Sequence, residues 1–399
     1  MSVPLEGIRV VELAQVWAVP GAGMYLADQG ADVIKVEPPW GDEARRLLTA
    51  SPLRMKDGST MPRHFLPLNR NKRSIVVDMT KQEGLEIIYR LVKVSDVFLH
   101  NLRPAAIRKL KLDYDTLSEI NPRLVYLDFY PYGSKGPLSS RPAYDRLVQA
   151  YSGVHGRRTL PDGTPLSAGV WVADCATPIL IAYGVALALL CREKTGRGQK
   201  VETSLLAGAL AMQSMDLVML EGEEKSPPKS LADQAVFSPY RCADNRYMVP
   251  IIVKDDEWQR FCRALGIEHL ADDPLFATSQ ARADNSEVLF SLLDGVISTK
   301  TRDEWAKLME EHDVPSAPIL LPHEVFDHPQ MVQNELIIEV DDPRIGKVKM
   351  LGYLLKLSGG PPSVRRPAPL LGEHTEQVLK ETGYSEEEIR ALRMKGVIG

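Results

Sequence analysis

Asp174 stands in surroundings that are unusual for a carboxylate. Apolar residues dominate both sides of it, and residues 179–191, which follow, are typical of a buried helix. Burying an unpaired charge costs free energy and usually raises the pKa of a carboxyl group. Position alone favours an N-cap of the following helix, because a capping Asp accepts backbone N–H bonds at the first helical turn. A catalytic carboxylate is the alternative.

Two groups of cations lie beside predicted strands. They are Arg70, Lys72 and Arg73, and Arg108, Lys109 and Lys111. Solvated cations at a strand edge would be a purely structural explanation, whereas a phosphate clamp would be a functional one. Because ligands of α/β sheets collect at the carboxyl ends of the strands, both groups could meet at one anionic ligand.

Length and composition narrow the class of protein. The chain has 399 residues, of which 44% are hydrophobic and 25% are charged, as in a soluble globular protein of two domains. The net charge of −5 predicts no nucleic acid and no anionic membrane as a partner. The N-terminus lacks a signal-peptide pattern, no apolar run reaches about 18 residues, and the four cysteines have no metal-ligand spacing. We therefore expect a cytoplasmic protein without a membrane span or a metal site.

The elements that would position these residues form an α/β pattern. A strand, a Gly-rich turn, a helix and a second strand follow one another within the first 37 residues, which predicts a βαβ unit and a parallel sheet. Gly21 and Gly23 resemble the start of a dinucleotide fingerprint. Leu26 stands at the place of its third glycine, however, and the acid Glu37 comes early, so an NAD site is disfavoured.

The chain divides into two predicted domains. Further strands are expected near residues 74–77, 97–100 and 123–130, whereas a polar, Pro-rich stretch before residue 240 indicates a linker. The expected division is a large α/β domain over 1–200, a linker over 201–239, a small α+β domain over 240–321, and a return linker and C-terminal segment over 322–399 that completes the large domain.

Nine segments in a fixed order make the chain resemble the class III CoA-transferase family, which includes formyl-CoA and carnitine CoA-transferases and has α-methylacyl-CoA racemase as a relative. The segments are 7–13, 26–37, 69–75, 101–104, 120–125, 144–145, Asp174, 193–199 and 371–375. The resemblance extends over nearly the whole chain. It implies a large Rossmann-like parallel-sheet domain completed by the C-terminal segment, a small domain, and two chains that interlock as a dimer.

The resemblance also implies a role for Asp174, which aligns with the nucleophilic aspartate of the family. This carboxylate would attack an acyl-CoA thioester to give a mixed anhydride, and the CoA thiolate would return to form an aspartyl-CoA thioester. A free carboxylic acid would then take the CoA. The substrates would be acyl-CoA, for example succinyl-CoA, and a carboxylic acid, with no tightly bound cofactor and no metal.

Carried over by position, the CoA site comprises residues after three strands and at one helix start. They are Val16, Trp17, Ala18, Asn69, Asn71, Lys72, Arg73, Asn101, Leu102, Arg103, Arg108, Lys109, Tyr144 and Asp145. The sequence departs from the family at Pro38, where relatives often carry arginine. Trp17 replaces a smaller or amide residue beside the thioester, which suggests either an aromatic wall for an apolar acyl group or core packing.

Two other functions stay open. The racemase branch uses a His as one of its two proton-transfer residues, and Tyr144 stands at that place; a tyrosine, with an ordinary pKa of about 10, is a poor base at neutral pH. The chain could also be a non-catalytic subunit of a heteromeric transferase, although it retains Asp174 and both basic groups. A homodimer and a heteromer are both compatible with the sequence. The acids that exchange CoA stay undetermined: Trp17 and Tyr151 suggest a bulky apolar acid, and Arg157 and Arg158 a dicarboxylic acid.

Overall fold

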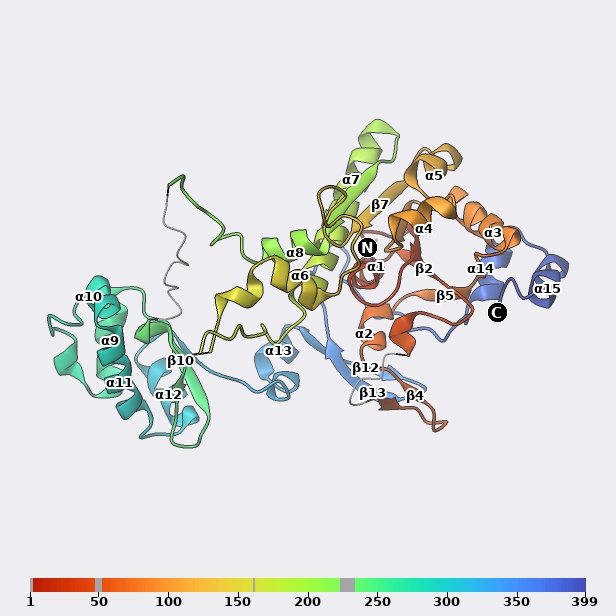
Figure 1. Cartoon of the computed structure of the whole chain (residues 1–399). Coiled ribbons are helices and arrows are strands. Elements are labelled where there is room, and N and C mark those ends of the chain that lie inside the picture. Colours follow the sequence, from red (N-terminus) through yellow and green to blue (C-terminus); the bar gives the residue numbers. More distant parts are fainter. Residues whose placement is uncertain (1–2, 47–51, 161, 223–233) are drawn as a thin grey trace. The chain divides into compact units, whose positions relative to one another are not determined.

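The computed structural model describes residues 3–46, 52–160, 162–222 and 234–399 (Figure 1). The chain forms two compact units. The large unit contains Met1–Glu221 and Pro329–Gly399, and the small unit contains Gly222–His328.

A six-stranded sheet forms the centre of the large unit, with the strand order β5-β2-β1-β6-β7-β8. The strands are β1 (Arg9–Leu13), β2 (Asp32–Glu37), β5 (Arg73–Val76), β6 (Val97–His100), β7 (Val125–Tyr130) and β8 (Lys200–Ser204). All pairs are parallel. The predicted parallel-sheet α/β fold is thereby confirmed. The carboxyl ends of the strands share one edge, where the connecting loops of such folds bind ligands.

Helices cover both faces of this sheet. In chain order, the helices of the large unit are α1 (Ala18–Asp28), α2 (Phe65–Asn69), α3 (Gln82–Lys93), α4 (Pro104–Lys109), α5 (Tyr114–Ile120), α6 (Asp145–Tyr151), α7 (Val172–Thr195), α8 (Leu205–Ala211), α13 (Pro329–Gln333), α14 (Thr375–Glu381) and α15 (Glu386–Met394). Of these, α13 contacts the strand β12. Because successive strand residues point to opposite faces, Val10 joins the core under α1 and α7, whereas Val11 joins the core under α3, α14 and α15.

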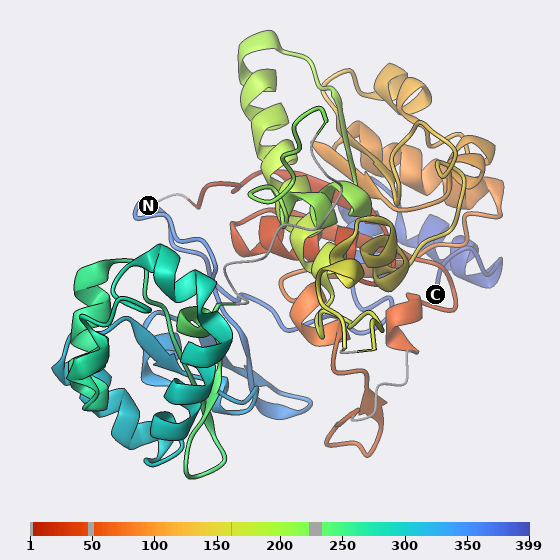
Figure 2. The same cartoon turned by 60° about the vertical axis from the view of Figure 1, so that its left-hand side comes forward.

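The C-terminal segment completes the large unit. Ile87 of α3 shares a core with Val378 of α14 and Ile389 of α15, and the two C-terminal helices lie beside α3 in both views (Figures 1 and 2). The segment also contributes the antiparallel hairpin β12 (Ile337–Asp342) and β13 (Gly346–Leu351). A shorter hairpin, β3 (Leu53–Arg54) with β4 (Thr60–Met61), precedes α2. A large unit completed by the C-terminus agrees with the expected organisation.

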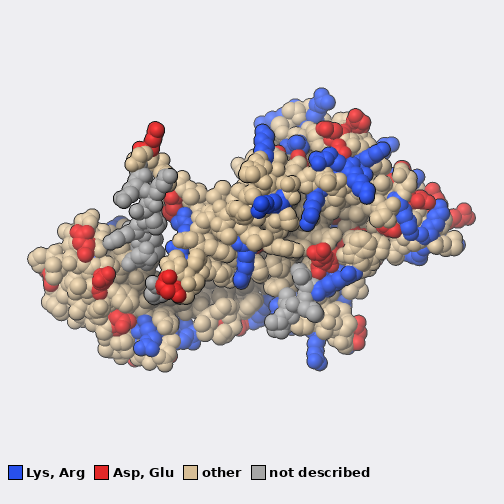
Figure 3. Space-filling model, viewed as in Figure 1, with Lys and Arg blue, Asp and Glu red and all other residues tan. Residues whose placement is uncertain are grey.

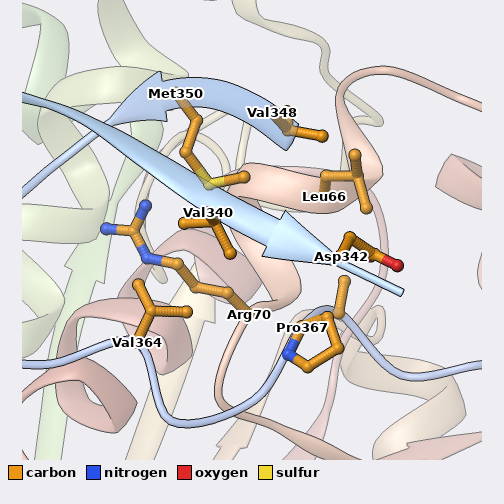
Figure 4. Close-up of a pocket in the computed structure, with 9 residues that line it drawn as sticks. Leu66, Arg70, Val340, Asp342, Val348, Met350, Val364 and Pro367 are labelled. Atoms are coloured by element: carbon orange, nitrogen blue, oxygen red, sulfur yellow. The ribbon is translucent and has the colours of Figure 1, made fainter. Parts of the chain in front are cut away.

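Arg70 connects the β12–β13 hairpin to α1. Its side chain lies beneath β12 and β13, close to Val340 and Met350 (Figure 4). Its guanidinium ion-pairs with Asp28 at 2.6 Å and donates to the backbone oxygen of Gly352 at 3.1 Å. The cation therefore fixes two distant parts of the chain to each other.

The small unit is an α+β unit with its own core. Its antiparallel sheet has the order β11-β10-β9, and Trp258 and Trp305 are fully buried among its helices. The elements are β9 (Tyr240–Arg241), β10 (Tyr247–Pro250), α9 (Asp255–Leu265), α10 (Ser279–Asp284), α11 (Ser286–Ile297), α12 (Arg302–Glu311) and β11 (Ser316–Pro318).

The large unit extends further than the expected limit at residue 200. The segment expected to begin a linker instead forms β8 and α8. The Ser204 side chain caps α8 by accepting the N–H of Ala207, and a Cβ on Gly208 would lie 2.2 Å from the hydroxyl oxygen of Thr177, so α8 packs closely on α7. Much of the remaining expected linker, residues 223–233, lies outside the described residues.

The Gly-rich turn expected after β1 is a helix. Gly21 and Gly23 lie inside α1, which already begins at Ala18. A Cβ on Gly21 would lie 3.0 Å from Pro178 of α7, and a Cβ on Gly23 would lie 1.8 Å from the carboxylate of Glu12. These glycines allow close packing, which explains why they match a dinucleotide fingerprint only in part.

Candidate active site

Asp174 lies in the first turn of α7, two residues inside the helix. Trp171 is the N-cap residue, so the expected capping role of Asp174 is wrong. The cap comes instead from Asp145, whose Oδ2 accepts the backbone N–H of Asp174 at 2.9 Å. Asp145 is the first residue of α6 and is buried, and the side-chain amide of Gln149 donates to its other oxygen. The Asp174 side chain is thus free of the capping role.

Burial and a neighbouring charge change the acidity of this site. Burial, followed by the negative charge of Asp145, raises the pKa of Asp174 to about 7. Burial and the charge of Asp174 also raise the pKa of the Cys175 thiol. A carboxyl group that titrates near neutral pH, in a partly buried position beside a second carboxylate, is typical of a functional site.

Two tryptophans lie beside the start of α7. The ring centroids of Trp17 and Trp171 are 4.8 Å apart, and those of Trp17 and His64 are 5.6 Å apart. The Arg146 guanidinium lies 5.5 Å from the Trp171 ring centroid. Trp171 is 38% exposed, so this aromatic group belongs to the surface around Asp174 as well as to the packing of the loop after β1. Trp17 is therefore brought to the site.

The loop after β1 is held by side chains from two other loops. Asn101, which follows β6, accepts the N–H of Gln15 at 3.1 Å and donates to its carbonyl at 2.7 Å. Asp42, which follows β2, accepts the N–H of Val16 at 2.9 Å. Val16 has φ +70°, a left-handed conformation that is costly for a β-branched residue. These contacts fix Val16 and Trp17 at the carboxyl edge of the sheet.

A mainly apolar hollow of about 170 Å³ lies at the same edge. Leu13 of β1, Val36 of β2 and Leu102 after β6 line it, together with Gln15 and Pro38. Of the CoA-binding residues expected from the sequence, the hollow contains Leu102. Pro38, at the place where relatives often have arginine, forms part of its apolar wall.

Cations surround the end of β6. Arg103 is the N-cap residue of α4, and Arg108 and Lys109 lie in its last turn. All three are exposed, and within the described residues none forms an ion pair. Lys and Arg side chains gather over the α4 region of the large unit (Figure 3). These expected phosphate-binding groups are therefore accessible.

The other basic group is buried, and its expected role in a phosphate clamp is not supported. Lys72 is fully buried, and its Nζ contacts Glu12 at 2.8 Å and the carbonyl of Pro20 at 2.7 Å. Burial lowers its pKa to about 8, although Glu12 opposes this effect. Arg73 ion-pairs with Asp32 at 2.5 Å and with Glu381 at 2.7 Å. The cations are thus neither solvated nor free.

Two amides of the same loop are also structural. Asn69 is buried; its Nδ2 donates to the carbonyl of Phe65 at 3.0 Å, and its Oδ1 accepts from Lys72 at 3.0 Å. Asn71 is buried as well and donates to Asp28 at 2.8 Å. Their side-chain hydrogen bonds lie within the protein, so the sequence pattern of this loop reflects internal pairing.

The remaining expected residues lie at helix starts. Ala18 is the buried first residue of α1. Tyr144 is the N-cap residue of α6 and is 71% exposed, next to the buried Asp145.

Sequence reasoning missed two groups that position the site, Trp171 and the buried ion pairs beneath the loop after β1. Lys35 ion-pairs there with Glu12 at 3.2 Å and with Asp42 at 2.7 Å. Glu12 could have been noticed as a charge within an apolar strand. Among the described residues, no group of three or more His, Cys, Asp or Glu side chains could hold a metal ion.

Known proteins resemble this chain over nearly its whole length. The family model for CoA-transferase family III matches residues 5–375. The chain is 34% identical to the formyl-CoA:oxalate CoA-transferase of Streptomyces coelicolor, covering 99% of both chains. It is also 34% identical to the human succinyl-CoA:glutarate CoA-transferase, covering 99% of this chain and 90% of the relative.

A solved structure of a CAIB/BAIF family protein from Brucella suis superimposes with a TM-score of 0.84 at 31% identity, and covers 96% of this chain and 100% of the other. Because the family model, the relatives and the fold agree over almost the full length, the chain belongs to CoA-transferase family III.

Proposed function

We propose that this enzyme transfers CoA from an acyl-CoA, for example succinyl-CoA, to a free carboxylic acid, with Asp174 as the nucleophile. The observation that carries the proposal is the side chain of Asp174 at the start of α7, with its pKa raised to about 7 and its backbone N–H held by Asp145. Relatives named as formyl-CoA:oxalate and succinyl-CoA:glutarate transferases support this class of donor and acceptor.

The reaction proceeds by four acyl exchanges. The Asp174 carboxylate attacks the thioester carbonyl, and the C–S bond breaks to give an anhydride and the CoA thiolate. The thiolate attacks the aspartyl carbonyl of the anhydride, which releases the donor acid and leaves an aspartyl-CoA thioester. The acceptor carboxylate attacks this thioester in turn, and the thiolate then attacks the acceptor carbonyl of the new anhydride. Asp174 is regenerated, and the new acyl-CoA leaves.

The start of α7 suits the charge that develops in these steps. Within the described chain, no hydrogen bond uses the backbone N–H of Val172 or Ala173. Such free N–H groups at the positive end of a helix stabilise an oxyanion. In our proposal they assist each tetrahedral intermediate formed at the Asp174 carboxyl carbon.

CoA would extend along the carboxyl edge of the sheet. The hollow beside Leu102 would take the adenine ring, and Arg103, Arg108 and Lys109 would bind the phosphates. Gln15 lines this hollow, and Trp17, two residues further along the loop, contacts Trp171 at the start of α7. In our proposal, CoA follows the loop after β1 from the hollow towards the start of α7.

We further propose that two copies of the chain assemble through α7. Exposed apolar side chains repeat along one side of this helix at Ile179, Tyr183, Leu187 and Leu190. By length and composition alone, α7 is the one helix among the described residues that could cross a membrane. Its other side packs in the core of the large unit through Ile181 and other residues. A second copy covering the exposed stripe would bury it, as in the interlocked dimers that the resemblance implies.

The decisive experiment compares the wild type with Asp174→Asn. After incubation with succinyl-CoA and reduction with borohydride, mass spectrometry should find a modified Asp174 peptide in the wild type. The variant should bind CoA and fold normally, and its kcat should fall by at least about three orders of magnitude. An Asp256→Asn variant, at an exposed position of the small unit, serves as the matched control. Retained turnover in Asp174→Asn would refute the covalent mechanism.

A further inference from the structure

A second cavity lies at the edge of the sheet opposite the proposed CoA site. Its volume is about 300 Å³, and Arg9, Asp32 and Arg73, which begin β1, β2 and β5, line it. The apolar hollow is lined by residues near the ends of the same strands, such as Leu13 and Val36. Because these strands are parallel, the two cavities lie at opposite edges.

Positive charge is in excess in this cavity. The charged lining residues are Arg9, Arg73, Arg365, Arg366, Asp32 and Glu381. Arg73 shares both carboxylates with Arg9, whose nitrogens lie 3.1 Å from Asp32 and 3.4 Å from Glu381. These two arginines and two acids balance one another. The positive charges of Arg365 and Arg366 remain unbalanced.

The charges of these two arginines are not compensated by carboxylates. The Arg365 guanidinium donates to backbone carbonyls, those of Ala27 at 2.6 Å and Gly30 at 3.3 Å. The Arg366 guanidinium has no hydrogen-bond or ion-pair partner among the described residues. Two positive charges therefore face the cavity without a matching anion.

Asn71 fixes the backbone of both arginines, which are exposed residues. The buried side-chain oxygen of Asn71 accepts the backbone N–H of Arg365 at 2.6 Å and that of Arg366 at 3.0 Å. The backbone N–H of Asn71 donates to the carbonyl of Arg366 at 3.0 Å. A backbone fixed in this way loses little conformational entropy when a ligand binds. The backbone positions from which the two side chains extend are therefore fixed before an anion binds.

We propose that this cavity is a second anion site, which takes a phosphate or pyrophosphate group. A phosphoryl group carries a charge of about −1.5 to −2 at neutral pH and offers three acceptor oxygens, which matches the excess of two positive charges. Guanidinium groups bind such oxygens in pairs. The site is separate from Asp174, and the proposal does not depend on CoA transfer.

The test is calorimetric titration of the full-length chain with inorganic pyrophosphate in the presence of saturating CoA. The CoA occupies the residues that we propose bind phosphate in the substrate site. We expect binding to the wild type, at least about tenfold weaker binding to Arg366→Gln, and tighter binding to Glu381→Gln because a carboxylate is removed. Arg90→Gln is the matched control, since Arg90 pairs with Glu86 outside this cavity. CoA binding should be the same in Arg366→Gln and the wild type.

Further arms identify the source of the phosphate group. ADP binding that depends on Arg366 supports a nucleotide, and binding of pyrophosphate alone supports the inorganic anion. The proposal is refuted by no binding, by displacement of pyrophosphate by CoA, by equal affinities of Arg366→Gln and Arg90→Gln, or by stronger binding of citrate than of pyrophosphate. If the chain fails to bind CoA, the proposed function is contradicted. The pyrophosphate titration is then repeated without CoA on a chain that carries both Arg103→Gln and Arg108→Gln, so that the second site is still tested.

Discussion

At the scale of single residues, two neighbouring acids, Asp145 and Asp174, have different surroundings. Asp145 is buried and accepts hydrogen bonds from the Asp174 backbone and from Gln149. Asp174 lies in a partly buried position where burial and the neighbouring charge favour the neutral form. Two neighbouring acids in different environments commonly have separate roles. In our proposal, Asp145 positions the start of α7 and Asp174 reacts.

The pH dependence of the reaction follows from the raised pKa of Asp174. Only the carboxylate is nucleophilic, so kcat/KM should rise with pH and reach half of its plateau near pH 7. Asp145→Asn removes the neighbouring negative charge but keeps an oxygen that can accept the Asp174 N–H, so the midpoint should move to lower pH. Initial rates with succinyl-CoA between pH 5 and 9 measure both profiles. Identical midpoints would contradict the electrostatic coupling.

The raised pKa of Asp174 makes stability and activity change in opposite directions with pH. The folded pKa of Asp174 lies above the ordinary value of about 3.9. The folded state therefore binds more protons than the unfolded state between about pH 4 and 7, and the stabilisation present below pH 4 is lost as the pH rises through 7. Activity at this residue thus increases over the pH range in which its contribution to stability decreases.

A pair of variants distinguishes buried from accessible cations. Lys72→Ala breaks a fully buried pair with Glu12 and should lower the free energy of unfolding by about 3–5 kcal/mol. Arg103→Gln changes an exposed residue and should leave stability nearly unchanged while weakening CoA binding about tenfold. Urea unfolding and CoA titration measure the two effects. If Lys72→Ala is as stable as the wild type and has lost only CoA affinity, the hypothesis that Lys72 belongs to a phosphate clamp is supported.

At the scale of secondary structure, α1 illustrates a conflict between helix propensity and packing. Alanine is a better helix former than glycine by about 1 kcal/mol. Gly21 and Gly23 nevertheless lie within this helix, because α7 and the buried carboxylate of Glu12 approach its backbone. The close approach of α1 and α7 brings Trp17 to the start of the helix that carries Asp174.

Alanine at two glycines should therefore have opposite effects. Gly23→Ala would place its Cβ 1.8 Å from Glu12 Oε2, so the buried ion pairs must move and stability should fall by about 1–3 kcal/mol. Gly295→Ala, in α11, meets no atom within 4 Å and should stabilise the small unit by about 0.5–1 kcal/mol. Thermal unfolding measures both. A stabilising Gly23→Ala would contradict the packing explanation.

At the scale of the whole molecule, the two ends of the chain build one unit. Helices α14 and α15 share a core with α3, and Arg70 joins α1 to the loop after β13. The exposed stripe on α7 then stays as an apolar surface of that unit. Soluble monomers rarely expose a contiguous apolar surface of this kind, which supports a second copy as its cover.

Charge on the stripe should separate the proposed dimer. Tyr183→Glu combined with Leu187→Glu places two carboxylates on the side of α7 that is already exposed, so the fold should be retained and the molar mass in light scattering should halve. Met394→Glu, at an 83% exposed position of α15, is the control and should remain dimeric. A wild-type chain that is monomeric at micromolar concentration would contradict the assembly.

The parallel-sheet fold, the family and the candidate nucleophile can be predicted from the sequence alone, because strand and helix patterns are local and nine motifs occur in one order. The sequence has a limit at the basic residues. It could not distinguish the cations at 70–73, which are buried in ion pairs, from Arg103, Arg108 and Lys109, which are exposed. Both groups have the same local pattern. Their partners, such as Glu12 and Glu381, lie as far as about 300 residues away in the chain.

Only the tertiary structure decided the role of Asp174 at its helix. A local pattern placed it before the helix as a cap, whereas the fold brings Asp145 of α6 to that position and places Asp174 inside the first turn. The tertiary structure also brings Trp171 against Trp17, although 154 residues separate them in the chain. Burial and long-range pairing set the pKa, the packing and the accessibility of a side chain, and neither is encoded in the residues next to it.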